Sequence, residues 1–311
     1  MDKFNRVYSL SVDVDSRSAA DIQKDPLAVT EQVNIQLPYT LEFAISRHDL
    51  SSSQTGTFRI FGLGKNIRDA IQKDVFTMQQ LRSITLRAGY RSSTGTIMPL
   101  MFNGTVLTAY SWRESTNWVT EISAYDGGFS IANAYQMTPL VAKAGTRMDA
   151  TLKTLALTLP LTNRNPIIGD FPQTPLRDVV LSGNTWDMIQ MASGNRATID
   201  NGQVKILNEK EVFKNPNLDT ISSDYGLLGS PKRTASTLEF DMIFEPRLSV
   251  GQIVALKSTT NEQFNRDWKV LGFDHHGTIS PSVAGECRTM VRLWFTLGDL
   301  LPISDALPVI R

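Results

Sequence analysis

The feature that most constrains this chain is an alternation of apolar and polar residues with a period of two. It runs through Val33, Ile35 and Leu37, and resumes at Leu41 after Pro38. Side chains on a β-strand point alternately to opposite faces, so this period predicts strands with one buried face. The same pattern predicts strands at 84–88, 100–109, 118–124, 238–242, 253–257, 268–273 and 290–295.

Helical spacing of apolar residues occurs in two longer segments. One lies within 65–80, between predicted strands. The other lies within 146–159, where Thr146 is a plausible N-cap and Pro160 ends the helix. Because the first helix only interrupts a run of strands, a barrel or sandwich with one flanking helix fits better than an alternating α/β fold.

A small α+β module is predicted in the middle of the chain. Asn184 or Thr185 can cap a short helix, and Gly194 can end it in the left-handed conformation. Asn201-Gly202, between alternating apolar residues, predicts a two-residue hairpin of type I′, because both turn positions need positive φ.

The predicted fold class is mainly β with an α+β insert, in which two tube-like β-barrel domains flank the small α+β domain. Residues 213–236 have little apolar pattern and contain Pro and Gly, which favours a linker or long loop. The predicted segments are 1–32 (an N-terminal arm or first strand), 33–137 (first barrel with one helix), 138–212 (α+β domain), 213–236 (linker), 237–300 (second barrel) and 301–311 (extended tail).

A weak repeat suggests that the two predicted barrels are duplicates. The tetrapeptide Thr-Leu-Glu-Phe occurs at 40–43 and at 237–240, each time opening a run of strands. The last strand of each run carries a tryptophan, Trp118 or Trp294. One shared tetrapeptide arises easily by chance in a β-rich sequence, but the shared order of elements constrains the architecture.

Composition excludes several classes of protein. The chain of 311 residues carries 31 Lys plus Arg and 31 Asp plus Glu, without the basic excess of a nucleic-acid-binding domain. Its one cysteine, Cys287, cannot form a disulfide within the chain, which fits assembly in a reducing cytoplasm. The sequence lacks an obvious signal peptide and any apolar run long enough to cross a bilayer, so we expect no membrane binding by the protein itself.

No motif in the sequence indicates catalysis or a cofactor. The run 62–65 (Gly-Leu-Gly-Lys) lacks the preceding Gly of a phosphate-binding loop and has Asn66 where that loop needs Ser or Thr. No Gly-x-Ser-x-Gly nucleophile elbow occurs. His275 and His276 are adjacent on a predicted strand and therefore face opposite sides, which argues against a shared metal. We expect no catalytic, cofactor-binding or metal-binding residues.

Several short motifs together resemble the baseplate hub proteins of tailed bacteriophages. They cover 40–43, 58–63 and 67–71, then 85–90, 101–106 and 121–127. A second set lies at 244–251, 268–270 and 276–277, so the resemblance extends over about residues 33–298. Residues 1–32 are not clearly covered and could form an arm that adds a strand to a neighbouring subunit.

The resemblance implies a structural role in the virion, after assembly in the host cytoplasm. Such hubs are homotrimers in which two barrels per chain form a pseudo-sixfold ring, and this ring joins the sixfold tail tube to the threefold central spike around a lumen for DNA. The implied partners are the tail tube protein, the spike protein, the tape measure protein and other baseplate proteins. We expect a contractile tail and no sequence-specific binding of nucleic acid, since a lumen through which DNA slides should not be strongly basic.

Two other functions remain open from the residues alone. A carbohydrate-binding module or adhesin would need clustered exposed aromatic side chains, whereas the tryptophans here are scattered along the chain. A tail-associated cell-wall hydrolase would need a catalytic constellation, which no motif supports.

Overall fold

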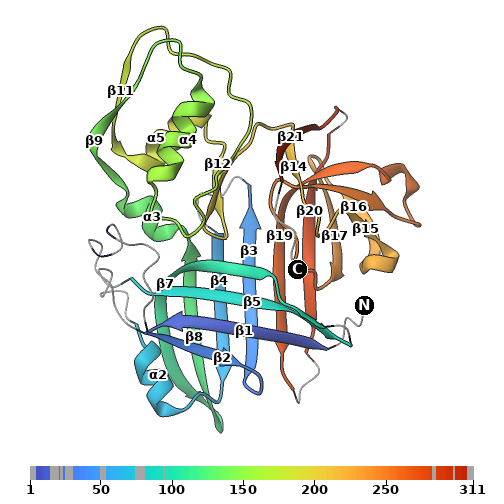
Figure 1. The fold of residues 1–311 in the computed structure, drawn as a ribbon. Coiled ribbons are helices and arrows are strands. Elements are labelled where there is room, and N and C mark those ends of the chain that lie inside the picture. Colours follow the sequence, from blue (N-terminus) through green and yellow to red (C-terminus); the bar gives the residue numbers. More distant parts are fainter. Residues whose placement is uncertain are drawn as a thin grey trace.

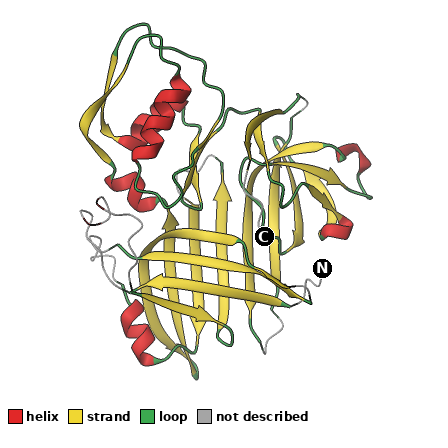
Figure 2. Ribbon diagram, viewed as in Figure 1, coloured by secondary structure: helices red, strands yellow, loops and turns green. Residues whose placement is uncertain are grey.

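The computed structural model describes residues 5–14, 21, 24, 31–49, 54–73, 81–93, 95–281, 285–296 and 298–306. Within them the protein is mainly β, with an α+β insert, as predicted (Figure 2). Residues 74–80 of the predicted first helix and residues 307–311 of the predicted tail lie outside the described residues. No helix in the described ranges is both long and apolar enough to span a membrane.

The N-terminal part of the chain is a strongly curved sheet with one helix. Its strands β1, β2, β5 and β7 cross in front of β3, β4 and β8 (Figure 1), and a buried apolar core lies among these strands. The elements are β1 (Arg6–Asp13), β2 (Gln32–Gln36), β3 (Thr40–His48), β4 (Gln54–Phe61), α2 (Lys65–Ile71), β5 (Ser83–Ser92), β6 (Gly95–Ile97), β7 (Leu100–Glu114) and β8 (Asn117–Asp126).

The segment 1–32, which the sequence left as an arm or first strand, contributes β1 to this sheet. β1 pairs antiparallel with both β2 and β5 of its own chain. Leu10 and Val12 are buried in the core, which explains the pairing within the chain. Residues 6–13 of this segment are therefore a strand of the chain's own sheet.

The middle of the chain forms the α+β insert around its own apolar core. The predicted hairpin is confirmed, because Asn201 and Gly202 have φ of 55° and 69° between β12 and β13. The elements are α3 (Gly128–Asn133), β9 (Tyr135–Ala142), α4 (Met148–Thr158), β10 (Ile167–Ile168), β11 (Val179–Asn184), α5 (Thr185–Ser193), β12 (Ala197–Asp200) and β13 (Gln203–Ile206).

The caps of the two longer helices differ in how well the sequence predicted them. Asn184 caps α5 by accepting from the N–H groups of Trp186 and Asp187, and Gly194 ends it at φ 68°. The predicted Thr146 cap of α4 is wrong: Arg147 occupies the N-cap without a side-chain cap bond. Its guanidinium instead binds Asp149 in the first turn, which places a carboxylate near the positive end of the helix.

The C-terminal part of the chain forms further strands around a third apolar core. These are β14 (Glu211–Lys214), β15 (Thr220–Ser222), β16 (Leu227–Arg233), β17 (Thr237–Ile243), β18 (Ile253–Lys257), β19 (Asp267–Ile279), β20 (Cys287–Trp294) and β21 (Leu301–Ala306), with short 3₁₀ helices η2 (Ser223–Tyr225) and η3 (Glu262–Phe264).

The linker predicted at 213–236 is a set of paired strands. β15 pairs with β18 and β16 pairs with β17. Period-two patterning fails here for a physical reason: β15 is only three residues long, and the register of β16 shifts between Leu228 and Lys232.

Candidate assembly surface

One continuous sheet joins the N-terminal and C-terminal parts of the chain. Its strand order is β16-β17-β20-β19-β3-β4-β8-β7-β5-β1-β2. The joint is the antiparallel pairing of β19 with β3, which runs from Gly272 opposite His48 to Ile279 opposite Leu41. We call this pairing the junction (Figure 1). Two regions separated by more than 200 residues in sequence are thus held by a shared hydrogen-bond ladder.

The joined strands present two different faces because of their alternating sequence. One face carries the apolar cores. On the other, which we call the outer face, most of the residues that lie opposite one another from β17 to β8 are at least partly exposed, with Gly272 and Val119 among the exceptions. One row of partners across this face is Asp241, Met290, Asp274, Ser46, Thr55 and Tyr125.

Ion pairs between neighbouring strands neutralise charge on the outer face. Arg59 of β4 lies 3.2 Å from Glu42 of β3, 3.6 Å from Glu121 of β8 and 3.0 Å from Glu114 of β7. Arg292 of β20 pairs with Asp274 of β19. Because these groups are partly exposed, each pair adds little to stability, and their main effect is a surface without a large field of one sign.

The two parts of the sheet repeat one strand arrangement. In the first half the order is β3-β4-β8-β7-β5, and in the second it is β16-β17-β20-β19, with β18 on the other side of β19. Each strand of one half therefore has a counterpart in the other. One connection differs between the halves. The chain forms α2 between β4 and β5, whereas the described chain forms no helix between their counterparts β17 and β18.

A β-bulge marks the same place in both halves. The register of β7 against β8 shifts between Val106 and Thr108, and that of β19 against β20 shifts between Val270 and Gly272. The extra residue is a leucine each time, Leu107 or Leu271. Just before the bulge, the N–H of Val106 donates to the carbonyl of Arg82, the residue that precedes β5, at 2.8 Å. In the second half, the N–H of Val270 donates to the carbonyl of Gln252, the residue that precedes β18, at 2.9 Å. The shared bulge sets the two halves in register residue by residue.

This register corrects the sequence evidence for the repeat. Thr-Leu-Glu-Phe at 40–43 lies on β3, whose counterpart is β16, whereas the copy at 237–240 lies on β17. Counted from the bulge, 237–240 corresponds to 55–58, which reads Thr-Gly-Thr-Phe. The shared tetrapeptide is a coincidence, although the order of elements that it suggested is present.

His275 lies buried at the junction, and its neighbour His276 faces the outer side. The ring of His275 is 4.7 Å from that of Phe273, and its Nδ1 is 2.8 Å from the Thr289 hydroxyl. Burial, followed by the charge of Arg47, lowers the pKa of His275 to about 3. This histidine therefore stays neutral in the folded protein at neutral pH.

A buried charged cluster ties the insert to both halves of the sheet. Arg47 of β3 binds Asp200 of β12 and lies 3.4 Å from Asp126 of β8. Lys205 of β13 lies 2.5 Å from Asp200, and the hydroxyl of Ser249, in the loop between β17 and β18, donates to Asp200 at 2.9 Å. The charged side chains are at most 2 % exposed. Their partners come from all three parts of the chain.

The two carboxylates in this cluster have opposite pKa shifts. Burial raises the pKa of Asp126 to about 6, against the opposing charge of Arg47. Burial would also raise the pKa of Asp200, but the charges of Lys205 and Arg47 outweigh it and lower that pKa well below its usual range. Asp200 is thus the ionised centre of the cluster.

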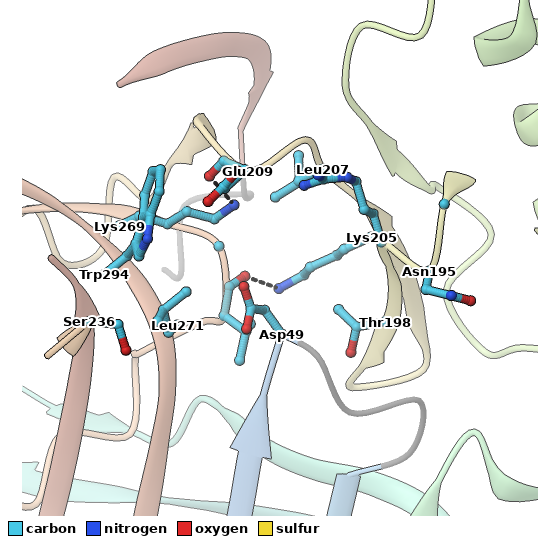
Figure 3. Close-up of a pocket in the computed structure, with 14 residues that line it drawn as sticks. Asp49, Asn195, Thr198, Lys205, Leu207, Glu209, Ser236, Lys269, Leu271 and Trp294 are labelled. Carbon is cyan, nitrogen blue, oxygen red and sulfur yellow. Dashed lines mark hydrogen bonds between the residues drawn. The ribbon is translucent and has the colours of Figure 1, made fainter. Parts of the chain in front are cut away.

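A pocket of about 550 Å³ lies between the insert and the second half of the sheet (Figure 3). Asp49, Lys205, Glu209, Lys269 and Trp294 are among its lining residues. Burial lowers the pKa of Lys269 to about 8. Its amino group donates to the backbone carbonyls of residues 208 and 209 at 3.1 and 3.0 Å, and Lys205 is held in the charged cluster. Both amines are committed to structural contacts.

The other residues weighed in the sequence are dispersed in the structure. Gly62, at φ 78°, belongs to a turn between β4 and α2. Cys287 is buried, and its thiol donates to the carbonyl of Thr278. Trp186 and Trp268 are core residues, whereas Trp112 and Trp118 are partly exposed on β7 and β8. Within the described part of the chain no group of three or more His, Cys, Asp or Glu could hold a metal ion. Sequence reasoning missed the charged cluster, because its members carry no motif and meet only in three dimensions.

Comparison with known families identifies the class of protein. A family model described as baseplate hub gp41 matches residues 21–277. The chain belongs to this family, and it is a structural protein of the phage tail baseplate and thus of the virion. No curated protein matches the chain significantly.

Solved structures with the same fold include tail proteins from two bacterial sources. The 43 kDa tail protein of prophage MuSo2 from Shewanella oneidensis aligns with a TM-score of 0.54 at 7% identity, covering 93% of this chain and 97% of that one. A tail protein from Neisseria meningitidis MC58 aligns at 0.52 and 10%, covering 92% and 96%. A chain of the Francisella PdpA-VgrG complex aligns at 0.51 and 8%, covering 97% of this chain and 60% of that chain.

Proposed function

We propose that this protein is the central hub of the baseplate, a homotrimer in which the two halves of each chain form a pseudo-sixfold ring between the sixfold tail tube and the threefold spike. The observation that carries this proposal is the duplication, which includes a shared strand order and a shared β-bulge. Three copies of a duplicated chain present six similar units, so one molecule can match threefold and sixfold partners.

The outer face of the sheet is the surface that would line the DNA lumen. It is a polar surface that crosses both halves, and Arg59 and Arg292 on it are paired with carboxylates of neighbouring strands. Each uncompensated cation near DNA would add salt-dependent affinity for phosphate and slow its passage. The cross-strand ion pairs suit a lumen that DNA traverses without binding.

The insert, which extends from α3 to β13, would then lie beside the ring, available to the spike or to other baseplate proteins. The buried charged cluster holds the insert to both halves of the sheet, so it would move with the ring as one body. The tail tube, spike and tape measure proteins are the proposed partners, in a contractile tail, with assembly in the host cytoplasm.

The mass of the native particle tests this proposal. Light scattering after size exclusion should give three times the 34.6 kDa chain mass over a range of concentrations. A monomer at every concentration would contradict the trimer and the ring.

We also propose that the protein has no enzymatic activity. The two amines of the pocket, Lys205 and Lys269, are engaged in structural contacts, and Ser249, whose hydroxyl contacts the Lys205 amine, donates to Asp200. Purified protein should release no fragments from peptidoglycan, and measurable release would support the hydrolase alternative instead. A glycan-array screen, expected to be blank, tests the adhesin alternative.

A further inference from the structure

The junction between β3 and β19 implies a second contact of the same kind. Because the halves are duplicates, each strand of the junction has a counterpart: β3 corresponds to β16, and β19 corresponds to β7. Within the chain, β3 pairs with β19, but β16 and β7 lie far apart in the strand order of the sheet. The repeat therefore leaves one copy of this contact unmade.

Both counterparts are edges in the described structure. β16 is the first strand of the sheet and pairs only with β17 among the described residues. β7 pairs with β5 only up to Thr105, while its remaining length pairs with β8 on the other side. An isolated bridge from Lys73 covers Ala109, and beyond it no described strand pairs with residues 111–114 on that side.

Backbone geometry shows which groups this edge offers. The N–H and C=O of Ala109 both bond to Lys73, so they point toward the open side. Strand groups alternate in direction, and the N–H and C=O of Ser111 and Arg113 therefore point the same way. These groups form a short open edge to which an incoming strand can bond. In the register derived below, both groups of Ser111 can be bonded, whereas Arg113 meets the irregular segment that ends at Pro231, which has no N–H to donate.

We propose that β16 of one copy of this chain pairs antiparallel with residues 111–114 of β7 in the next copy, which repeats the junction between subunits. The bulge register gives the partners. Trp112 corresponds to His276, which faces Ala44, and the counterpart of Ala44 is Lys232. Trp112 thus faces Lys232, and by the same count Ser111 faces Arg233.

The charges beside the two edges are complementary. Arg59 is surrounded by three carboxylates, Glu42, Glu114 and Glu121. Together with the exposed Arg113 of the same edge, these groups have one carboxylate in excess. The β16 edge carries Lys232 and the adjacent Arg233. Such complementarity favours the pairing of β16 with β7 over the pairing of two edges of like charge. It commits the occupant of the edge to a second copy of the same chain.

A designed disulfide tests the register directly. Because the groups of Ser111 point toward the incoming strand, Trp112 and Lys232 form the non-hydrogen-bonded pair, whose Cα atoms lie roughly 4.5 Å apart, within the range of a disulfide. Trp112→Cys combined with Lys232→Cys should, after mild oxidation, give a covalent trimer on a non-reducing gel. The matched control is Tyr125→Cys with Lys232→Cys, since Tyr125 is also partly exposed but lies on β8, inside the sheet.

This inference rests on the proposed trimer, and the experiment separates the two. If light scattering gives a trimer but the designed pair cross-links no better than the control, the edge pairing is wrong and the trimer stands. If the unmodified protein is a monomer throughout, both fail.

A second variant does not depend on cysteine chemistry. Ser111→Pro removes an N–H that points away from β8, so it should abolish the trimer mass. The resulting monomer should still fold, with a melting temperature within a few degrees of that of Ser111→Ala under conditions where both are monomers. Ser111→Ala keeps this N–H and should remain a trimer. A Ser111→Pro protein that still forms trimers would overturn the edge pairing.

Discussion

The two halves of the sheet share a backbone plan but almost no sequence. Strand order and the position of one bulge coincide, whereas counterparts such as Gly56 and Leu238 differ in size and chemistry. Hydrogen-bond register belongs to the backbone and tolerates any side chain that keeps its face apolar or polar. The comparison teaches that duplication in a β protein is better detected from register and bulges than from shared short peptides.

The largest loss of unfolding free energy is expected in the buried charged cluster, where the two halves and the insert meet. Asp200→Asn leaves Lys205 and Arg47 buried without their main counter-charge, so it should cost about 3–5 kcal/mol of unfolding free energy. Urea denaturation measures this loss. Asp126→Asn serves as the control and should cost less, because burial already disfavours the charged form of Asp126. Equal losses would contradict the central role of Asp200.

Phe58 and Phe240 are counterparts in the two halves, and truncating each one tests how much each half depends on this core position. Phe58 is fully buried, with its ring 5.3 Å from that of Phe102, while Phe240 is 5% exposed. Each change to Ala should cost about 3–5 kcal/mol, and Phe58→Ala should be the larger loss. Thermal unfolding measures the two. A negligible loss for either variant would mean that its half does not depend on the shared core position.

Gly56 tests whether the counterpart positions can exchange side chains. A Cβ at Gly56 would lie 2.8 Å from the Phe58 ring and 2.9 Å from the Phe102 ring, although Leu238 fills the corresponding place in the second half. Gly56→Ala should therefore cost about 1–3 kcal/mol from overpacking. Gly64→Ala, at a position with ordinary φ and open space around it, is the control without overpacking. A stabilised Gly56→Ala protein would show that the two cores are interchangeable.

The smallest effect is the contribution of Asp126 to the pH dependence of stability. His275, whose pKa is lowered on folding, contributes with the opposite sign but is present in both proteins compared. The pKa of Asp126 is raised from 3.8 to about 6 on folding, so the folded state binds more protons between these values. Its contribution to stability therefore falls as pH rises from about 4 to 6. The stability of Asp126→Asn relative to the unmodified protein should rise over that window by roughly 1 kcal/mol or more, as measured by denaturation at each pH. A flat difference would contradict the raised pKa.

Local sequence determined much of the secondary structure. Alternation at Leu41, Phe43 and Ile45 is enough to give β3 one buried and one exposed face. Asn201-Gly202 specifies its turn because two consecutive positive φ values exclude most residues, and Asn184 caps α5 through its own side chain. These features depend on contacts within a few residues.

Tertiary structure decided how these elements combine. Three features join residues that lie far apart in the chain. These are the pairing of β3 with β19, the alignment of the two halves, and the charged cluster of Arg47, Asp126, Asp200 and Lys205. The sequence pattern predicts a linker at β16 because this strand pairs with β17 in an irregular register and has no period-two alternation of its own. Alternation predicts which face of a strand is buried, but any strand with the same period can lie beside it. The neighbour of each strand is therefore determined by packing in the cores.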